Sequence, residues 1–170
     1  AADAMRWDSL ITRNATDGIA EVFYSLATAV NGQTENTFTL LHSRAAVYLR
    51  PDYTEAIILS AGLLEQMDQY DLAAAAFAQV PAKDPSFYIA EIGRANTTYA
   101  MGDKPGGLKI LRDLAKQHPE ILAVQIALGD GLQDSHHAAQ RRGDRRSDVQ
   151  PQRHGQRQHR GADADHDQRL

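Results

Sequence analysis

The sequence contains no cysteine. This absence excludes a disulfide framework, a zinc site with thiolate ligands and a cysteine nucleophile. No apolar run approaches the roughly 20 residues that a helix needs to span a membrane, so we expect no membrane partner. No segment sustains the alternation of apolar and polar residues that a half-buried strand requires, and we therefore expect no sheet.

Motifs of catalysis are also missing. The sequence has neither the HExxH pattern of zinc proteases nor the nucleophile elbow of hydrolases. Residues 102–107 are glycine-rich, but their spacing is not that of a phosphate-binding loop and they follow a predicted helix. We interpret His42 and His118, which are isolated, as surface or helix-end residues. We predict that the chain is not an enzyme and has no cofactor and no bound metal.

The charge balance narrows the class of partner. The formal net charge is −4, and residues 1–132 alone hold 10 basic and 16 acidic residues. An acidic surface repels the phosphate backbone, so we expect no nucleic-acid partner. With 42% hydrophobic residues, the chain has enough apolar side chains for a substantial core.

Three prolines mark a repeat. Pro51, Pro85 and Pro119 stand 34 residues apart. Small residues keep the same register, with Ala27, Ala61, Ala95 and Gly129 at one repeat position and Thr39, Ala73 and Gly107 at another. Because two helices approach to about 8–10 Å only where the crossing side chains are short, these positions predict close helix pairs.

The period and its residues resemble the tetratricopeptide repeat of bacterial proteins, a unit of 34 residues. In the repeat closed by Pro85, the residues Ala61, Ala73 and Phe77 match the family pattern, whereas Ser60 departs from it. The resemblance covers residues 18–133. It implies an all-α fold, a tetratricopeptide-like helical-hairpin solenoid of three repeats plus a partial fourth.

Helix-start and turn signals divide this array into segments. We predict helices over 18–31, 36–49, 53–67, 70–80, 86–101, 105–117 and 120–132. The domain organisation follows, with residues 1–17 as an N-terminal extension or the end of a preceding helix. Residues 18–133 form the array, and residues 134–170 form a polar, non-globular tail.

The resemblance also implies a ligand groove, since the first helices of tetratricopeptide hairpins line a concave face. Its ligand-facing positions carry apolar residues with acidic points between them. They are Glu21, Tyr24, Thr28, Glu55, Ile58, Glu65, Ile89, Ile92, Asn96, Tyr99, Ile126 and Asp130. None is Lys or Arg, so the carboxylate clamp of the chaperone-binding members is not expected. An amphipathic, basic helix or peptide suits this face. Alternatively, Ile58, Ile92 and Ile126 pack between neighbouring helices.

The tail breaks the pattern. Beyond alanine, its only aliphatic residues are Val149 and Leu170, and arginines stand where the second helix of a fourth repeat needs apolar residues. Three interpretations remain open: a solvated disordered tail, out-of-frame reading of a GC-rich gene, and a metal site. The third uses the five tail histidines, His136, His137, His154, His159 and His166.

Two functional hypotheses follow. The first is a non-catalytic interaction scaffold that binds a protein or peptide in the groove. The second is a structural fragment of a longer solenoid that forms a homodimer through the open helix at 120–132. An accessory domain tethered to an enzyme is a third possibility. For the compartment, we expect either the cytoplasm or the bacterial periplasm.

Overall fold

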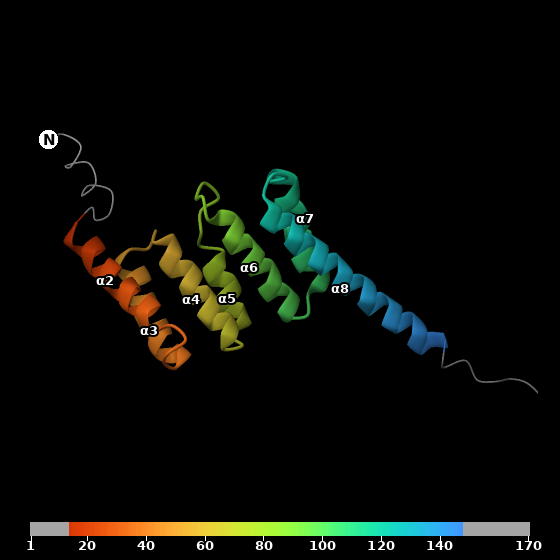
Figure 1. Cartoon of the computed structure of the whole chain (residues 1–170), viewed down its shortest axis with the longest axis horizontal. Coiled ribbons are helices and arrows are strands. Elements are labelled where there is room, and N and C mark those ends of the chain that lie inside the picture. The colour runs from red at the N-terminus through yellow and green to blue at the C-terminus, as the bar shows by residue number, and fades with distance from the viewer. Residues whose placement is uncertain (1–13, 148–170) are drawn as a thin grey trace, which may run out of the picture. The chain divides into compact units, whose positions relative to one another are not determined.

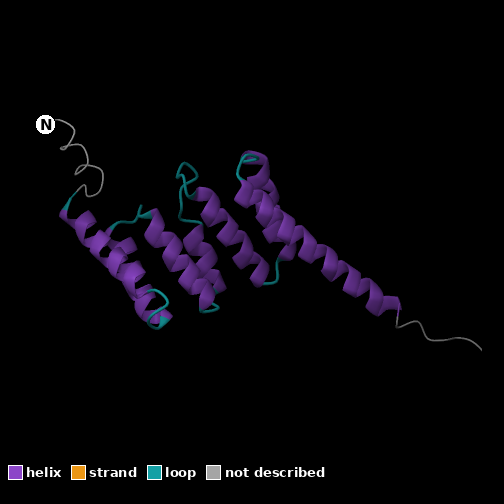
Figure 2. Cartoon of the chain, in the orientation of Figure 1, coloured by secondary structure: helices purple, strands orange, loops and turns teal. Residues whose placement is uncertain are grey.

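The computed structural model describes residues 14–147, together with side chains up to His137, and all the regular secondary structure within this range is helical (Figure 2). Residues 1–13 of the predicted extension lie outside the described residues, as do residues 148–170, whereas residues 15–17 of that extension belong to the first described helix. The helices are α2 (Ala15–Val30), α3 (Asn36–Leu49), α4 (Thr54–Gln66), α5 (Tyr70–Phe77), α6 (Phe87–Ala100), α7 (Lys104–Gln117) and α8 (Leu122–Ser147).

The first six helices lie where the sequence predicted them, with ends that coincide or differ by at most three residues. They form three consecutive hairpins, α2/α3, α4/α5 and α6/α7 (Figure 1). Each helix from α2 to α6 contacts its successor, and α4 also contacts α6, the first helix of the next hairpin. This arrangement is the helical-hairpin array that the 34-residue period predicted.

The tight turns inside the hairpins use left-handed backbone conformations. Gly32, Asp68 and Gly102 have φ values of 74°, 58° and 95°, respectively. Asp68 and Gly102 occupy the same repeat position. A positive φ is easily adopted by glycine and tolerated by aspartate, so these residues reverse the chain after α2, α4 and α6.

The predicted small positions are the points of closest helix packing. Ala27 and Ala61 are completely buried and Ala95 is 1% exposed, as predicted. A β-carbon added to Gly107 on α7 would lie 2.7 Å from the carbonyl oxygen of Ala95 on α6. The small residues of the two helices therefore meet at one crossing, where a larger side chain would force the pair apart.

A second repeat position reports how the hairpins stack. Ala56, Ala90 and Val124 are 34 residues apart and each is completely buried. Val22, the equivalent residue of the first hairpin, is 67% exposed. No hairpin precedes it among the described residues. The face of each first helix that carries this position is thus the one that receives the preceding hairpin.

The departure at Ser60 has a structural explanation. Ser60 on α4 is completely buried and its hydroxyl donates a hydrogen bond of 2.9 Å to the Ser43 hydroxyl on α3, which in turn donates to the carbonyl oxygen of Leu40. A paired polar contact inside the core avoids the cost of burying an unsatisfied hydroxyl. The serine therefore links the first hairpin to the second, where the family pattern has another residue.

The last helix differs from the prediction. The predicted end at 132 is wrong, because α8 continues to Ser147. Residues 133–147 contain no proline and are rich in Ala, Gln and Arg, which have high intrinsic helix propensity, so the backbone remains helical without an apolar face. The chain divides into two units after His136, and within the second unit the described residues 137–147 are helical. In the described part of the chain, no helix is long and apolar enough to cross a membrane.

Candidate functional site

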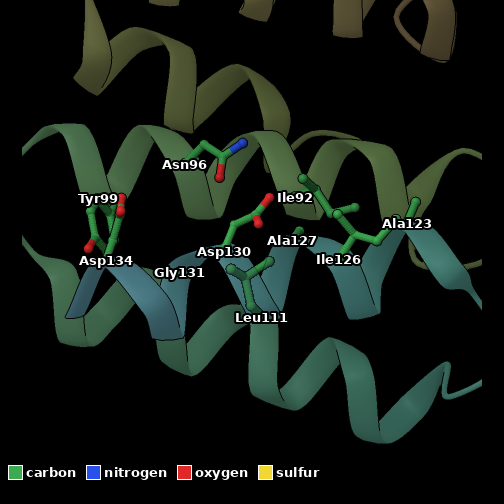
Figure 3. A pocket seen from close by; sticks show the side chains of 10 residues that line it. All are labelled: Ile92, Asn96, Tyr99, Leu111, Ala123, Ile126, Ala127, Asp130, Gly131 and Asp134. Carbon is green, nitrogen blue, oxygen red and sulfur yellow. The ribbon is translucent and has the colours of Figure 1, made fainter. Parts of the chain in front are cut away.

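A cavity of the array lies among α6, α7 and α8. It has a volume of about 420 Å³ and its lining is mostly apolar. Figure 3 shows the lining side chains, which come from the first helices α6 and α8 and from Leu111 of α7. We call this the α6–α8 pocket; it is lined by Ile92, Asn96, Tyr99, Leu111, Ala123, Ile126, Ala127, Asp130, Gly131 and Asp134.

Close contact between α7 and α8 forms the floor of the pocket. Leu108 and Leu111 are buried on α7, and a β-carbon added to Gly131 on α8 would lie 2.9 Å from Cδ2 of Leu108. Val124, on the same helix α8, is completely buried. The apolar stripe of α7 and the small residue on α8 therefore hold α8 against the array while leaving a hollow beside Leu111.

Polar groups surround the hollow. In Figure 3, Asp130 projects from α8 toward α6, where Ile92 and Asn96 stand. The Tyr99 hydroxyl is enclosed and has no hydrogen-bond partner among the described residues, while the Lys104 ammonium lies 4.7 Å from the centre of its ring. Asp130 and Asp134 are exposed and lie one helical turn apart. The pocket thus combines an apolar floor with a rim of acceptor groups.

Five of the sequence-predicted groove residues line this pocket together, namely Ile92, Asn96, Tyr99, Ile126 and Asp130. The alternative interpretation, that Ile58, Ile92 and Ile126 pack between neighbouring helices, holds for some of these isoleucines and not for others. Ile58 is partly buried and packs against the core around Ile57 and Phe77, whereas Ile126 is 55% exposed. Packing between hairpins therefore accounts for Ile58 but not for Ile126.

A second group of predicted residues lies between α2 and α4 and is tied into the core. The Tyr53 hydroxyl donates a hydrogen bond to the Glu21 carboxylate. The ring of Tyr24 lies 5.0 Å from that of Tyr53, and the Arg50 guanidinium lies 4.6 Å from the same Tyr53 ring. Burial raises the pKa of both tyrosines; Glu21 and the exposed Glu55 raise the pKa further. These contacts join the first two hairpins.

The remaining predicted residues lie apart from both groups. Burial raises the pKa of Glu65 on α4, which the Thr97 hydroxyl on α6 only partly opposes. Thr28 is exposed and donates to the carbonyl oxygen of Ser25, and Ile89 is 43% exposed. The first-helix positions therefore do not form one uniform surface but two clusters with Glu65 between them.

Sequence reasoning missed Tyr53, Leu111, Ala127, Gly131 and Asp134. Tyr53 precedes its helix, and Leu111 belongs to a second helix, so neither falls on the family's groove positions. The signal for Asp134 was its spacing, one turn after Asp130, but the predicted helix ended before it. Tracing the helical period past 132 would have found it.

Two of the tail histidines, His136 and His137, are described and lie on α8, while His154, His159 and His166 lie outside the described residues. Among the residues the structure describes, no three histidine or carboxylate side chains are grouped so as to hold a metal ion.

Comparison with known proteins identifies the fold. No protein-family model matches the sequence, and no curated protein matches it. Solved structures do match. The MamA 41-end structure from Desulfovibrio magneticus RS-1 is 18% identical, with a TM-score of 0.57 over 76% of this chain and 75% of that one. A double mutant described as MamA RS-1 ArsTM is 19% identical, with a TM-score of 0.58 over 81% of this chain and 80% of that one.

A further crystal structure of MamA is 13% identical, with a TM-score of 0.58 over 69% of this chain and 64% of that one. At these identities the likeness shows the fold alone. The chain has the tetratricopeptide-like fold, an all-α solenoid of helical hairpins with three repeats and a partial fourth, as predicted.

Proposed function

We propose that this chain is a non-catalytic interaction scaffold whose first helices bind a peptide or helix of a partner protein. The observation that carries the proposal is the α6–α8 pocket, in which five groove residues from two successive first helices surround one apolar hollow. The MamA structures share the architecture on which such a groove is built.

The size and chemistry of the pocket favour a side chain of a peptide. About 420 Å³ with an apolar floor accommodates one or two large side chains, and the acceptor groups of the rim fix their orientation. The lining has two carboxylates, Asp130 and Asp134, and no histidine, serine, cysteine or lysine. A mostly apolar lining with a few acceptor groups at its edge favours the binding of a side chain.

Selection from a random peptide library tests the proposal. We expect the wild-type chain to enrich a family of peptides, and the double variant Ile92→Ser/Ile126→Ser to lose them. Val22→Ser is the control, because Val22 is also an exposed apolar residue, at 67% against 55% for Ile126, but lies on α2. If no peptide is enriched, or if the pocket variant and the control retain the same peptides, this site is not the binding site.

A second candidate function is self-association through the open end of the array. Gly129 occupies the position at which Ala61 and Ala95 are buried by a second helix, yet nothing lies within 4 Å of where its β-carbon would be. Leu122 and Leu132 on the same helix are 71% and 41% exposed. The α8 of a second copy, antiparallel to the first, would supply the missing helix and form a symmetric dimer through residues 120–132.

Light scattering at micromolar concentration tests this candidate. We expect a dimer for the wild-type chain and a monomer for Leu132→Glu, because a buried unpaired carboxylate opposes helix packing at this face. Leu72→Glu, on an exposed apolar residue of α5, is the control and should leave the dimer intact. A wild-type monomer at these concentrations rules the candidate out.

A further inference from the structure

We propose that the α6–α8 pocket recognises an arginine that stands beside an apolar residue in the partner peptide. The inference rests on the proposed function, because it specifies the ligand of the same site. The apolar residue fills the hollow between Ile92, Leu111 and Ile126, and the guanidinium lies over the rim formed by Asp130 and Asp134.

The rim carboxylates carry the first part of the argument. Asp130 and Asp134 are four residues apart on α8, so both point to the same side of the helix and into the lining of the same pocket. Like charges at this spacing on one face of a helix destabilise that helix. The ion pairs found within residues 14–137 join Arg50 to Asp52, Arg94 to Glu91, Lys116 to Asp113 and His118 to Glu120, and none of them includes Asp130 or Asp134. A cation supplied by the ligand would therefore relieve a repulsion that the chain itself leaves in place.

The polar groups beside these carboxylates favour arginine over lysine. Asn96 on α6 adds an amide oxygen, and the Tyr99 hydroxyl is an enclosed group without a hydrogen-bond partner in the described part of the chain. A guanidinium has five donors in a planar fork and can address two or more acceptors at once, whereas an ammonium acts as a point charge. Lys104 lies over the Tyr99 ring.

The apolar part of the pocket adds the second requirement. An arginine alone would leave the apolar surface of the pocket exposed to water. This surface is formed by Ile92, Leu111, Ala123, Ile126 and Ala127. Burying an apolar side chain there is favourable in proportion to the apolar area removed from water. Recognition therefore depends on a pair of neighbouring side chains, one apolar and one cationic, and the acidic array attracts such a ligand over a longer range.

A charge-pair cycle tests the inference. From the peptides that depend on Ile92 and Ile126, one peptide with arginine and the same peptide with citrulline, its neutral isostere, are titrated against the full chain. We expect citrulline to weaken binding to the wild type by about two- to fivefold for each carboxylate contacted. Asp130→Asn/Asp134→Asn should bind both peptides equally, and raising the salt concentration should abolish the preference in the wild type.

Asp71→Asn is the matched control, since Asp71 is an exposed carboxylate on α5, away from the pocket. It should keep the full preference for arginine. If the citrulline peptide loses affinity to the same extent in Asp130→Asn/Asp134→Asn as in the wild type, or if the pocket-dependent peptides contain no arginine, the inference is wrong while the proposed function stands. If no peptide depends on the pocket, the proposed function itself fails.

Discussion

The phenyl ring of Phe77 on α5 lies against the α-carbon of Gly93 on α6, and a β-carbon at Gly93 would stand 2.6 Å from Cε1 of that ring. Phe77 is 4% exposed and belongs to the buried cluster formed with Ile57 and Ala61. Its ring therefore fills the space between two successive hairpins. This contact requires glycine at position 93.

Gly93→Ala should destabilise the array by about 1–3 kcal/mol, because the added methyl group overpacks a full core. The gain of up to about 1 kcal/mol in helix propensity does not offset this loss. Gly62→Ala is the matched control, since no atom lies within 4 Å of its β-carbon position on α4, and it should stabilise by about 0.5–1 kcal/mol. Urea unfolding measures both. Equal stabilisation by the two changes would show that the ring has room to move.

Ala61→Leu should cost about 1–3 kcal/mol, because Ala61 is completely buried at the crossing of α4 and α5. Ala29→Leu introduces the same side chain at an exposed position of α2 and should be nearly neutral. Thermal unfolding of the two variants compares them directly. An unchanged melting temperature for Ala61→Leu would mean that the helices do not cross closely at this repeat position.

Glu65 makes the stability of the array depend on pH. Burial raises its pKa above the ordinary value of 4.5, so the folded state binds the proton more tightly than the unfolded state. The protonated Glu65 carboxyl therefore makes its full contribution to the free energy of unfolding below pH 4.5. That contribution is lost as the pH rises through the pKa of Glu65 in the folded state. Glu65→Gln removes the ionised form and should be more stable than the wild type at pH 7.

The advantage of Glu65→Gln should shrink toward zero below pH 4.5, where both side chains are neutral. Urea unfolding midpoints at pH 4 and pH 7 give the difference in stability between the wild type and Glu65→Gln. The titration of all other groups cancels in this difference, because the two proteins share those groups. A variant that is less stable than the wild type at pH 7 would show that the Thr97 hydroxyl, rather than burial, dominates at this site.

Most of the fold was predictable because a repeat states the same information several times. The residues at Ala27, Ala61 and Ala95 need not each be recognised, since a shared register of small side chains is enough to predict a close helix pair. The same redundancy explains why the helices of the three hairpins were placed within a few residues of their true ends.

The site was less predictable, because the repeat position of a groove residue predicts the face of the helix on which it lies but not the contacts that its side chain makes. Glu21 and Asp130 occupy ligand-facing positions of their helices, yet Glu21 accepts a hydrogen bond from Tyr53 and Asp130 lines a pocket. Nothing in the periodicity separates these two roles. The difference arises because Tyr53 covers Glu21, whereas among the described residues no further helix follows α8 and Asp130 stays exposed.

The stability of the array should not depend on the end of the chain. The last completely buried side chain of the described residues is Val124, and residues from His137 on belong to a separate unit. Deleting residues 138–170 should leave the melting temperature of the array nearly unchanged, because the buried apolar side chains of the described residues all precede His137. A fall of more than a few degrees would instead assign a structural role to the deleted segment.

The open surroundings of Gly129 have a consequence for heating. In a stack whose units touch only their neighbours, the folded array behaves as a one-dimensional lattice in which each unit is held by the coupling to the units beside it. Within the first unit, residues 122–136 of α8 pack against α7 and have no second helix on the other side. Fraying therefore begins at this end, and the α6–α8 pocket disassembles while the earlier hairpins keep their helical signal. Binding should be lost at a lower temperature than helicity.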